Sequence, residues 1–269
     1  MSSQITEAFV QQYSNNVQML SQQKGSLLRG VVDVETVVGK HAYFERIGAV
    51  SAQKRVSMAD YEWADLIDQQ DRVRTLIDPT SSYALAAAYA MGRSMDDEII
   101  AAVSGNAFGG ETGSTTIALP AGQKITESGT AGLTIAKLRT AKETLDAASV
   151  DPSLPRTIVV GPRQITDLLG TTEVTSSDFN TVKALANGEI NQFMGFNFIV
   201  SNRLAISSSK RECLLFTNDA IKLALGKDVM TRIDERSDKG YATQVYVCMT
   251  MGATRLEDEK VVTIEAHEA

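Results

Sequence analysis

The feature that most constrains this chain is a helical run of about 24 residues, "SSYALAAAYAMGRSMDDEIIAAVSG", which begins after Asp78-Pro79-Thr80. Its Ala, Leu and Met residues are strong helix formers, and the polar residues ahead of it are candidate N-caps. The positions expected to face a core are 85, 88, 89, 92, 95, 99, 100 and 103, all of them apolar apart from Gly92. The acidic group Asp96-Asp97-Glu98 is interpreted as a solvated face. A helix of this length spans roughly 36 Å, so we expect it to be the structural axis of the protein.

Shorter helices and strands follow this run without a regular alternation. "TIAKLRTAKETLDAASV" predicts an amphipathic helix, and "RTIVVGPRQITDLLG" predicts a strand followed by a helix that a proline opens. "TVKALAN" predicts a further helix, and "GEINQFMGFNFIVSNRL" predicts a strand after a bend at Gly195. "ECLLF", "YATQVYVCMTMGATRL" and "VVTIEA" are strand-rich, and the whole order predicts an α+β fold. The apolar side of the first amphipathic helix holds Ile135, Leu138, Ala141, Leu145 and Ala148.

Three segments have the composition of projecting or connecting parts. Residues 1 to about 30 are rich in Gln, Ser and Asn with a thin apolar stripe, which predicts an arm or short helix that needs a partner surface. Residues 31–78 combine β-like pieces with charges of both signs, which predicts a projecting hairpin. The glycine cluster "SGNAFGGETGSTT" lacks the GK[ST] ending of a phosphate loop and is interpreted as a flexible connector.

The chain carries few groups that catalyse reactions. It has two histidines and two cysteines in 269 residues, and its sequence holds no HExxH, CxxC or calcium-loop motif. His41 has no GxSxG motif to accompany it and is interpreted as a polar residue beside a hairpin. Cys213 and Cys248 lie in apolar runs typical of buried, unreactive thiols. We therefore expect no enzyme activity, no cofactor and no metal.

Composition and charge favour a globular protein made in the cytoplasm. Hydrophobic residues make up 43% of the chain, but no apolar run reaches the length that spans a membrane, and the first residues do not have the pattern of a signal peptide. The net charge of −7 argues against a protein whose surface is broadly covered by nucleic acid, while still allowing a local basic face.

The order of these parts resembles the major capsid proteins of tailed bacteriophages, the Hong Kong 97 fold, from about Val31 to Ala266. The matching motifs are the helix at 80–104, "SGNAFGG" after it, "TIVVGPRQITDLL", "INQFMGFNFIVSNRL" and "YATQVYVCMTMGATRLEDEKVVTIEA". The resemblance implies four parts along the chain. They are an N-terminal arm at 1–30, an extended β-hairpin loop at 31–78, a peripheral domain with a long spine helix at 79–150 and 240–269, and an axial domain at 151–239.

The resemblance also implies a function in association. Copies would assemble as hexamers and pentamers into an icosahedral shell, the capsid of a virion made in the cytoplasm of a bacterial host. The shell would enclose viral double-stranded DNA through nonspecific contacts, with a portal and a separate scaffolding protein as partners and no membrane. Some relatives cross-link their shells covalently with the help of a glutamate. Thr250 and Met251 stand where that acidic residue would lie, so we expect no cross-link.

The residues expected to contact neighbouring subunits lie on the extended loop. Its charges alternate in sign, which suits the selection of register and partner, since a single exposed ion pair stabilises by only about 0 to 1 kcal/mol. Tyr61 and Trp63 are the stronger anchor candidates, because aromatic residues dominate interface energies. The full set of candidates is Glu45, Arg46, Lys54, Arg55, Tyr61, Trp63, Asp71, Arg72 and Arg74.

Three alternatives stay open at this point. An encapsulin-like nanocompartment, a shell that holds an enzyme cargo, would have the same fold and a similar length. An enzyme with a histidine-poor site would need carboxylates or serines that the sequence cannot single out. A tail or collar component of the same virus would also lack catalytic groups, but the long helix and the mixed α+β order favour a shell subunit.

Overall fold

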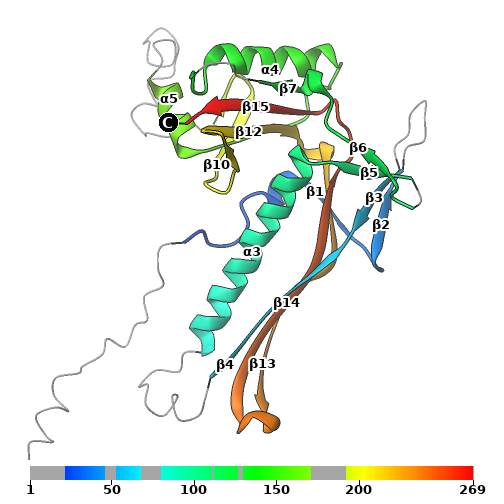
Figure 1. Ribbon diagram of the computed structural model, residues 1–269, viewed down its shortest axis with the longest axis vertical. Helices are drawn as coiled ribbons and strands as arrows, with labels where there is room; N and C mark the ends of the chain where they lie inside the picture. Colours follow the sequence, from blue (N-terminus) through cyan, green and yellow to red (C-terminus); the bar gives the residue numbers. More distant parts are fainter. Residues whose placement is uncertain are drawn as a thin grey trace, which may run out of the picture.

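The computed structural model of the protein describes residues 22–45, 53–67, 80–110, 112–126, 130–170 and 192–268. Three sheets organise these residues: a long four-stranded sheet beside helix α3 (Thr80–Ser104), a seven-stranded sheet at one end of that helix, and a second four-stranded sheet that projects to the side (Figure 1). The helix predicted at 80–104 is confirmed. The helix predicted at "TVKALAN", and the predicted arm up to residue 21, lie outside the described residues.

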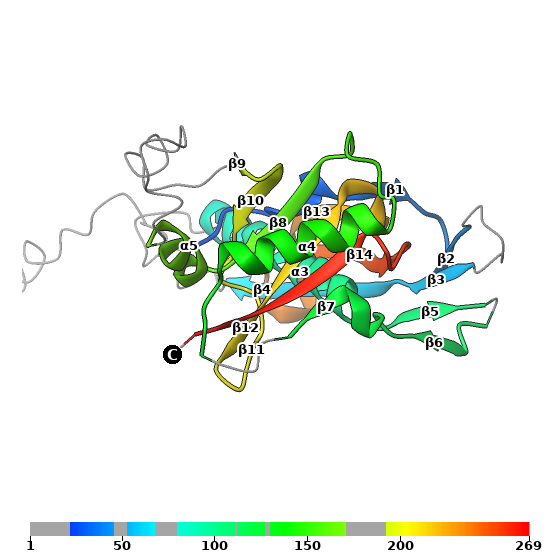
Figure 2. The same cartoon turned by 90° about the horizontal axis from the view of Figure 1, so that it is seen from above.

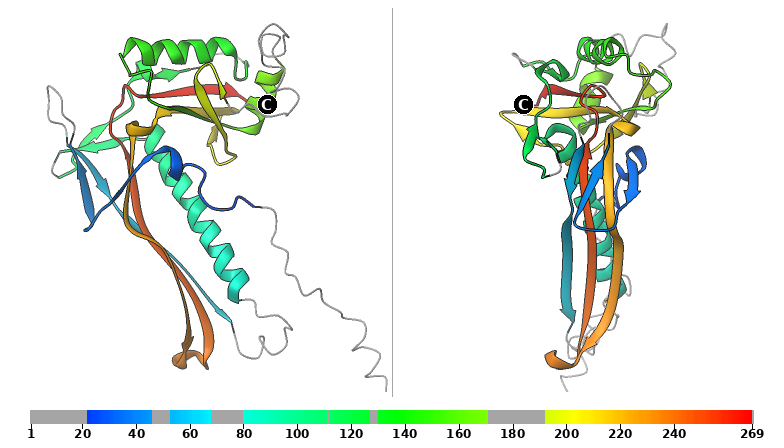
Figure 3. Two further views of the ribbon diagram at one scale, coloured as in Figure 1. Left: turned by 180° about the vertical axis from the view of Figure 1, so that it is seen from behind. Right: turned by 90° about the vertical axis from the view of Figure 1, so that its right-hand side faces the viewer.

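The long sheet has the strand order β1 (Asp33–Thr36), β13 (Ile221–Arg236), β14 (Ala242–Arg255) and β4 (Ala59–Ile67). β13 and β14 form an antiparallel ribbon that extends away from the seven-stranded sheet, and β4 runs antiparallel along β14 (Figure 3). α3 packs on one face of this ribbon. In the part of the chain that the structure describes, no helix covers the opposite face.

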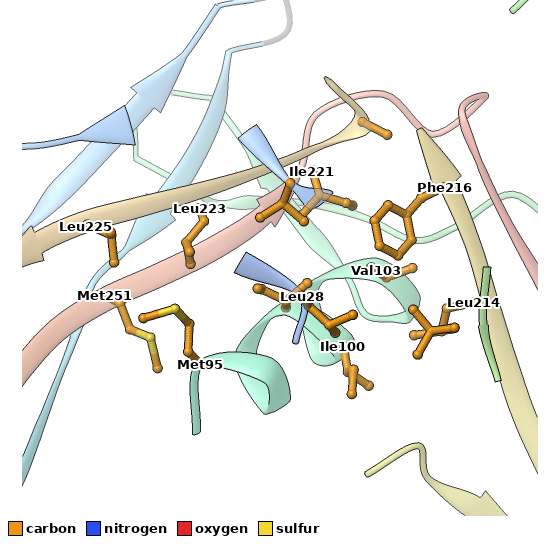
Figure 4. Close-up of a cluster of buried hydrophobic side chains, with 14 of the residues drawn as sticks. Leu28, Met95, Ile100, Val103, Leu214, Phe216, Ile221, Leu223, Leu225 and Met251 are labelled. Atoms are coloured by element: carbon orange, nitrogen blue, oxygen red, sulfur yellow. The ribbon is translucent and has the colours of Figure 1, made fainter. Parts of the chain in front are cut away.

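Side chains from α3 and from several strands meet in one apolar core (Figure 4). The helix supplies its buried face, β12, β13 and β14 supply the opposite wall, and the segment before β1 closes one side. Labelled members of this core are Leu28, Met95, Ile100, Val103, Leu214, Phe216, Ile221, Leu223, Leu225 and Met251.

The buried face of α3 differs from the predicted one in the first half of the helix. Ala87 and Met91 are buried there, whereas Leu85 points outward with half of its surface exposed. From Met95 onward the predicted face is confirmed as far as Val103. Ala, Leu and Tyr occur on every side of the first turns, so no single apolar stripe stands out in the sequence, and packing against β14 selects the buried one.

The seven-stranded sheet has the order β7 (Lys124–Ile125), β15 (Val261–His267), β12 (Lys210–Thr217), β8 (Arg156–Val160), β10 (Phe196–Val200) and β9 (Gln192–Phe193), with β11 (Ile206–Ser207) paired to β12. Helix α4 (Ile135–Ala147) covers one face, as the view from above shows (Figure 2), and side chains of α3 reach the other. All of β8 is buried, as expected for a central strand covered on both faces.

Three local predictions in this part are confirmed. α5 (Pro162–Leu169) follows β8 directly and begins at its proline. Between β9 and β10, Met194 and Gly195 both have positive φ, at 55° and 84°, in a two-residue hairpin turn that favours glycine. α4 turns its predicted apolar side toward the sheet, burying Ile135, Leu138, Ala141 and Leu145, with Ala148 half-buried after the helix ends.

The projecting sheet has the order β2 (His41–Phe44), β3 (Lys54–Ser57), β5 (Ala107–Gly109) and β6 (Thr115–Ile117). The glycine-rich segment after α3 was predicted to be a flexible connector, and this was wrong, because it supplies β5 and β6. Gly110 and Gly113 adopt positive φ between the two strands, and β6 consists of β-branched residues that favour pairing.

The strand pairing does not follow the four consecutive parts that were expected along the chain. Among the described residues of 31–78, β2 and β3 form a hairpin, and β4 leaves it to pair with β14. β13, within residues 151–239, pairs with β14, whereas β15, within residues 240–269, lies between β7 and β12 in the seven-stranded sheet. Short 3-10 helices complete the described chain: η1 (Arg29–Val31), η2 (Ala121–Gln123), η3 (Asn218–Ala220) and η4 (Ser237–Lys239).

Candidate subunit-contact surfaces

The acidic group on α3 was predicted to be a solvated face; Asp97 is exposed, but the prediction is wrong for Asp96, which is fully buried. Its carboxylate accepts hydrogen bonds from the backbone N–H groups of Leu27 (3.0 Å) and Leu28 (3.1 Å), from the Ser26 hydroxyl and from the Gln23 side-chain amide. A buried carboxylate is stable in a protein interior only when it is bonded in this way. Asp96 therefore fastens the segment that precedes β1 to the middle of the helix.

Two glycines allow this segment to approach α3 closely. A Cβ atom at Gly92 would lie 2.7 Å from the Cα of Gly25, which is closer than side chains tolerate. The next residue, Arg93, donates from Nη1 to the Gln22 side chain (2.9 Å) and to the Gln23 carbonyl (3.2 Å). The glycine in the predicted helix face is thus explained by a backbone contact that the sequence pattern did not reveal.

The next two acidic residues contact other parts of the chain. Asp97 forms a bidentate ion pair with Arg203, in the loop after β10, and Glu98 accepts a hydrogen bond from the Tyr61 hydroxyl of β4 (3.2 Å). Burial, and then the carboxylate of Glu98, raises the pKa of Tyr61 to about 12. Three consecutive acidic residues on α3 therefore join the helix to the segment before β1, to the loop after β10 in the seven-stranded sheet and to β4 in the long sheet.

A second buried polar cluster surrounds Arg255 at the end of β14. The Arg255 side chain is fully buried. Its Nη1 donates to the carbonyls of Val103 (3.0 Å) and Gly105 (2.7 Å) at the C-terminal end of α3, and its Nη2 donates to the Ile117 carbonyl of β6 (3.2 Å). Its Nε donates to Asp258. The guanidinium joins the helix end, the projecting sheet and the turn before β15.

Lys54, one of the predicted contact residues, belongs to this cluster. It is 1% exposed, and its Nζ lies 3.3 Å from the Asp258 carboxylate. Lys54 is on the inner face of β3, where the neighbouring β2 and β3 residues Ala42, Phe44 and Val56 pack in a small apolar core. Its charge is used inside the chain, so it has no exposed charge to present to another subunit.

The outer face of the projecting sheet carries a row of exposed side chains. Tyr43, Arg55, Phe108 and Thr116 lie directly opposite one another on β2, β3, β5 and β6, so all four point to the same side. Tyr43 is 45% exposed and Phe108 is 49% exposed. Arg55 is half-buried between them, with one guanidinium N–H donated to the Thr112 carbonyl. We call these four residues the aromatic row.

The structure places the other predicted contact residues differently. Tyr61 and Trp63 are half-buried and pack against the core beneath α3, so their rings already have partners within the chain. Glu45 is exposed beside the aromatic row and accepts a hydrogen bond from Gln53 (3.0 Å). The remaining candidates, Arg46, Asp71, Arg72 and Arg74, lie outside the described residues. Sequence reasoning missed Tyr43, because β2 reads His-Ala-Tyr-Phe and no sequence signal separates the exposed ring of Tyr43 from the buried ring of Phe44.

A second exposed strip follows the outer side of β4, away from α3. Asp60, Glu62, Ala64 and Leu66 alternate with the half-buried residues that face the core, and all four are exposed. Leu66 is a large apolar side chain with 44% of its surface exposed. No strand pairs with the outer edge of β4 in the described chain. We call these four residues the β4 strip.

The described residues show neither a metal centre nor a reactive thiol. No group of His, Cys, Asp and Glu with the spacing of metal ligands occurs among them, and no helix there is long and apolar enough to cross a membrane. Both cysteines are buried and unbonded, as predicted, and burial raises the pKa of the Cys213 thiol to about 12. His41 lies on β2 beside the β3 hairpin partner, as predicted.

Comparison with known families and structures gives one consistent result. The family model described as "Phage capsid protein" matches residues 5–57 and 53–268. The capsid structure of the cyanophage P-SCSP1u shares 18% identity at a TM-score of 0.73, over 98% of this chain and 95% of that one. The capsid of Ralstonia phage GP4 shares 12% identity at a TM-score of 0.73, over 96% and 95% of the two chains.

A shell of another kind is also similar. The holo-SrpI encapsulin complex from Synechococcus elongatus shares 10% identity at a TM-score of 0.66, over 98% of this chain and 95% of that one. At such identities these structures establish the fold. No curated protein matches the sequence.

Proposed function

Because this chain belongs to the phage capsid protein family and has the Hong Kong 97-type capsid fold, we propose that it is the major capsid subunit of a tailed bacteriophage, assembling as hexamers and pentamers into an icosahedral shell around viral double-stranded DNA. The observation that carries the proposal is the family match, which extends over almost the whole chain. A shell-forming protein needs contact surfaces and no reactive groups. The aromatic row and the β4 strip are surfaces of that kind.

The proposal assigns a part in the shell to each region. Residues 1–30 are the N-terminal arm, whose base is fastened by Asp96, and the β2–β3 hairpin is the extended loop. α3 with β4, β13 and β14 forms the peripheral domain. The seven-stranded sheet with α4 and α5 forms the axial domain, so β15 belongs to the axial domain and β13 to the peripheral one.

The partners and the cargo are part of the proposal too. A portal and a separate scaffolding protein would act during assembly in the bacterial cytoplasm, and packaged DNA would be held by nonspecific electrostatic contacts. The net charge of −7 makes strong, general attraction to DNA unfavourable. Loosely held DNA can be packaged and released without breaking specific contacts.

The experiment that tests the function is the mass and shape of the purified protein. Size-exclusion chromatography with light scattering, followed by negative-stain imaging, should show closed shells or discrete hexamers and pentamers. A protein that stays monomeric at high concentration, with and without co-expressed phage scaffolding protein, would contradict the proposal.

The encapsulin-like nanocompartment is the second candidate, favoured by the similarity to the SrpI encapsulin complex. The two functions differ in what the shell contains. Particles purified from cells after nuclease treatment should release protected DNA if the chain is a viral capsid subunit. Particles that release a single co-purified enzyme and no protected DNA would identify a nanocompartment.

A further inference from the structure

We propose that the side chains of Arg211 and Gln164 form a binding site for a carboxylate, and that Glu268 occupies this site as a releasable latch on the seven-stranded sheet. Arg211 lies on β12, Gln164 lies in the first turn of α5, and Glu268 directly follows β15, which runs antiparallel to β12 (Figure 2). The latch is a property of the single chain, so only its consequence for assembly rests on the proposed shell function.

The carboxylate site contacts both oxygens of its occupant. Arg211 donates from Nε to Oε2 of Glu268 and from Nη2 to Oε1 (3.1 Å), and Gln164 donates from Nε2 to Oε2 (3.2 Å). The planar fork of a guanidinium matches a carboxylate in this two-bond arrangement. The hydrogen bond from Arg211 is the main cause that lowers the pKa of Glu268, so the carboxylate is charged at neutral pH.

The burial of the site creates its need for a carboxylate. The Arg211 side chain is 5% exposed, and Gln164 is fully buried. In the described chain, the other side-chain hydrogen bond of Arg211 goes to the uncharged amide of Asn202 (3.3 Å). A buried cation without a counter-charge is strongly unfavourable, so the charge of Arg211 depends on Glu268.

Gly161 provides the space in which the site is built. A Cβ atom at this position would lie 2.5 Å from Oε1 of Gln164 and 2.7 Å from Cδ of Arg211, closer than real side chains approach. The φ of Gly161 is −84°, an ordinary value for any residue, so it is the lack of a side chain that matters here. Because Gly161 leaves this space, the amide and the guanidinium converge on one carboxylate.

The backbone beside Glu268 extends the latch to two further segments. The Glu268 N–H donates to the Ser209 carbonyl in the turn between β11 and β12 (2.7 Å), and the His267 N–H donates to the Ala131 carbonyl ahead of α4 (3.1 Å). The latch therefore joins α5, β12, the β11–β12 turn and the segment before α4. The Glu268 side chain is 22% exposed, so it can leave the site toward solvent while the sheet stays paired.

The latch has a consequence for assembly in the proposed shell. There the seven-stranded sheet with α4 and α5 is the axial domain, and the closed latch holds α5 and the β11–β12 turn in one arrangement. A surface that is already ordered loses little conformational entropy when it associates. Subunits with an open latch should therefore assemble to a smaller fraction than subunits with a closed one.

Chemical rescue tests the site directly. Glu268→Ala leaves the Arg211 cation unpaired and should lower the Tm of the unassembled protein in sodium chloride by about 5 to 10 °C. Sodium acetate at the same pH and ionic strength should restore most of this loss and should saturate, because acetate supplies the missing carboxylate. Hydrogen exchange should accelerate in α5 and in the β11–β12 turn of the variant in chloride, and acetate should slow it again.

Two controls separate binding in the site from a general effect of acetate. Glu257→Ala removes a carboxylate of similar exposure, 27%, whose partner Lys260 keeps Asp219, so it should respond to acetate as the unmodified protein does. Arg211→Met in the Glu268→Ala background removes the unpaired cation. This double variant should unfold at a higher temperature than Glu268→Ala alone and should show no specific acetate response.

The outcomes distinguish the site, the latch and the shell. If Glu268→Ala does not fold in chloride, its folding in acetate alone would support the site equally well. An equal acetate response of Glu268→Ala, Glu257→Ala and the unmodified protein would overturn the carboxylate site. Unchanged hydrogen exchange in α5 and in the β11–β12 turn of Glu268→Ala would overturn the latch.

Assembly is measured separately, by light scattering of the same proteins. Glu268→Ala should assemble to a smaller fraction in chloride than in acetate, and equal fractions would overturn the consequence for assembly. Failure of the unmodified protein to assemble in either salt would overturn the shell function, whereas the carboxylate site, which is measured on unassembled protein, would stand.

Discussion

Lys54 and Arg55 are adjacent cations on strand β3, and they lie in opposite environments. Lys54 points inward, is 1% exposed and pairs with Asp258, while Arg55 points outward between two exposed aromatic rings. Successive residues of a strand face opposite sides of a sheet, so one step along the chain separates a charge that supports folding from one that is free to support association. The comparison shows that charge pattern alone does not identify a contact residue.

The same contrast holds more widely between the interior of the molecule and its surface. Inside, Asp96 accepts four hydrogen bonds and Arg255 donates four, most of them to partners from distant segments. Outside, the aromatic row and the β4 strip expose apolar area beside charges. Substitutions inside should therefore lower the free energy of unfolding, and substitutions outside should lower assembly.

The largest effect is expected for Arg255→Met. The substitution leaves three backbone carbonyls without their donor and removes one cation from Asp258, so the free energy of unfolding should fall by about 3 to 5 kcal/mol. Urea denaturation of the unassembled protein measures it. The control Arg139→Met, on the exposed face of α4, should change stability by less than about 0.5 kcal/mol. Equal effects of the two substitutions would show that the Arg255 cluster stabilises nothing.

Asp96→Ala should follow, with a loss of about 3 kcal/mol, because four donors of residues 23–28 lose their buried acceptor. Hydrogen exchange should accelerate in that segment before it does so in the strands. Asp97→Ala provides the neighbouring control, since it removes only a partly exposed ion pair and should cost under about 1 kcal/mol. Unchanged exchange in residues 23–28 of the Asp96 variant would contradict the anchoring role.

The pH dependence of stability tests the interior from another side. Burial raises the pKa of Cys213 to about 12, whereas an unfolded thiol titrates near 8.5, so above that pH the unfolded state loses a proton that the folded state keeps. The contribution of the Cys213 thiol to the free energy of unfolding is fully present below about pH 8.5 and is lost as the pH rises toward 12. Between about pH 9 and pH 10 the loss should approach 1.4 kcal/mol per pH unit. Cys213→Ala should flatten this part of the profile, and an identical slope in both proteins would refute a buried thiol.

The smallest effects on stability are expected for substitutions of the two adjacent cations, Lys54 and Arg55. Lys54→Met should lower the free energy of unfolding by about 1 kcal/mol, because Asp258 keeps Arg255 as a partner. Arg55→Met should change it by less than about 0.5 kcal/mol and yet reduce the assembled fraction measured by light scattering. If Lys54→Met impaired assembly more than Arg55→Met at equal stability, the inside and outside assignments would be reversed.

Much of the fold was predictable from periodicity and local chemistry. The long helix, the amphipathic α4, the proline that opens α5 and the turn at Gly195 follow from patterns within a few residues. The errors arose where partners are distant in sequence. Asp96 looked solvated because its donors lie about seventy residues earlier, and the glycine-rich segment looked flexible because β3, its pairing partner, precedes α3. The packing of Tyr61 and Trp63 against the core beneath α3 was not visible in the sequence either, because α3 follows them in the chain.

By itself, the sequence determined the kinds of elements, the family resemblance and the absence of catalytic motifs, because each is written in local spacing or in residue types. Only the tertiary structure decided which charges are buried, which aromatic residues are exposed and which strands share a sheet. Those properties depend on contacts between residues far apart in the chain, such as Lys54 with Asp258 or Tyr43 beside Arg55 and Phe108. A surface for association is what folding leaves uncovered, so it is defined only when the chain has packed.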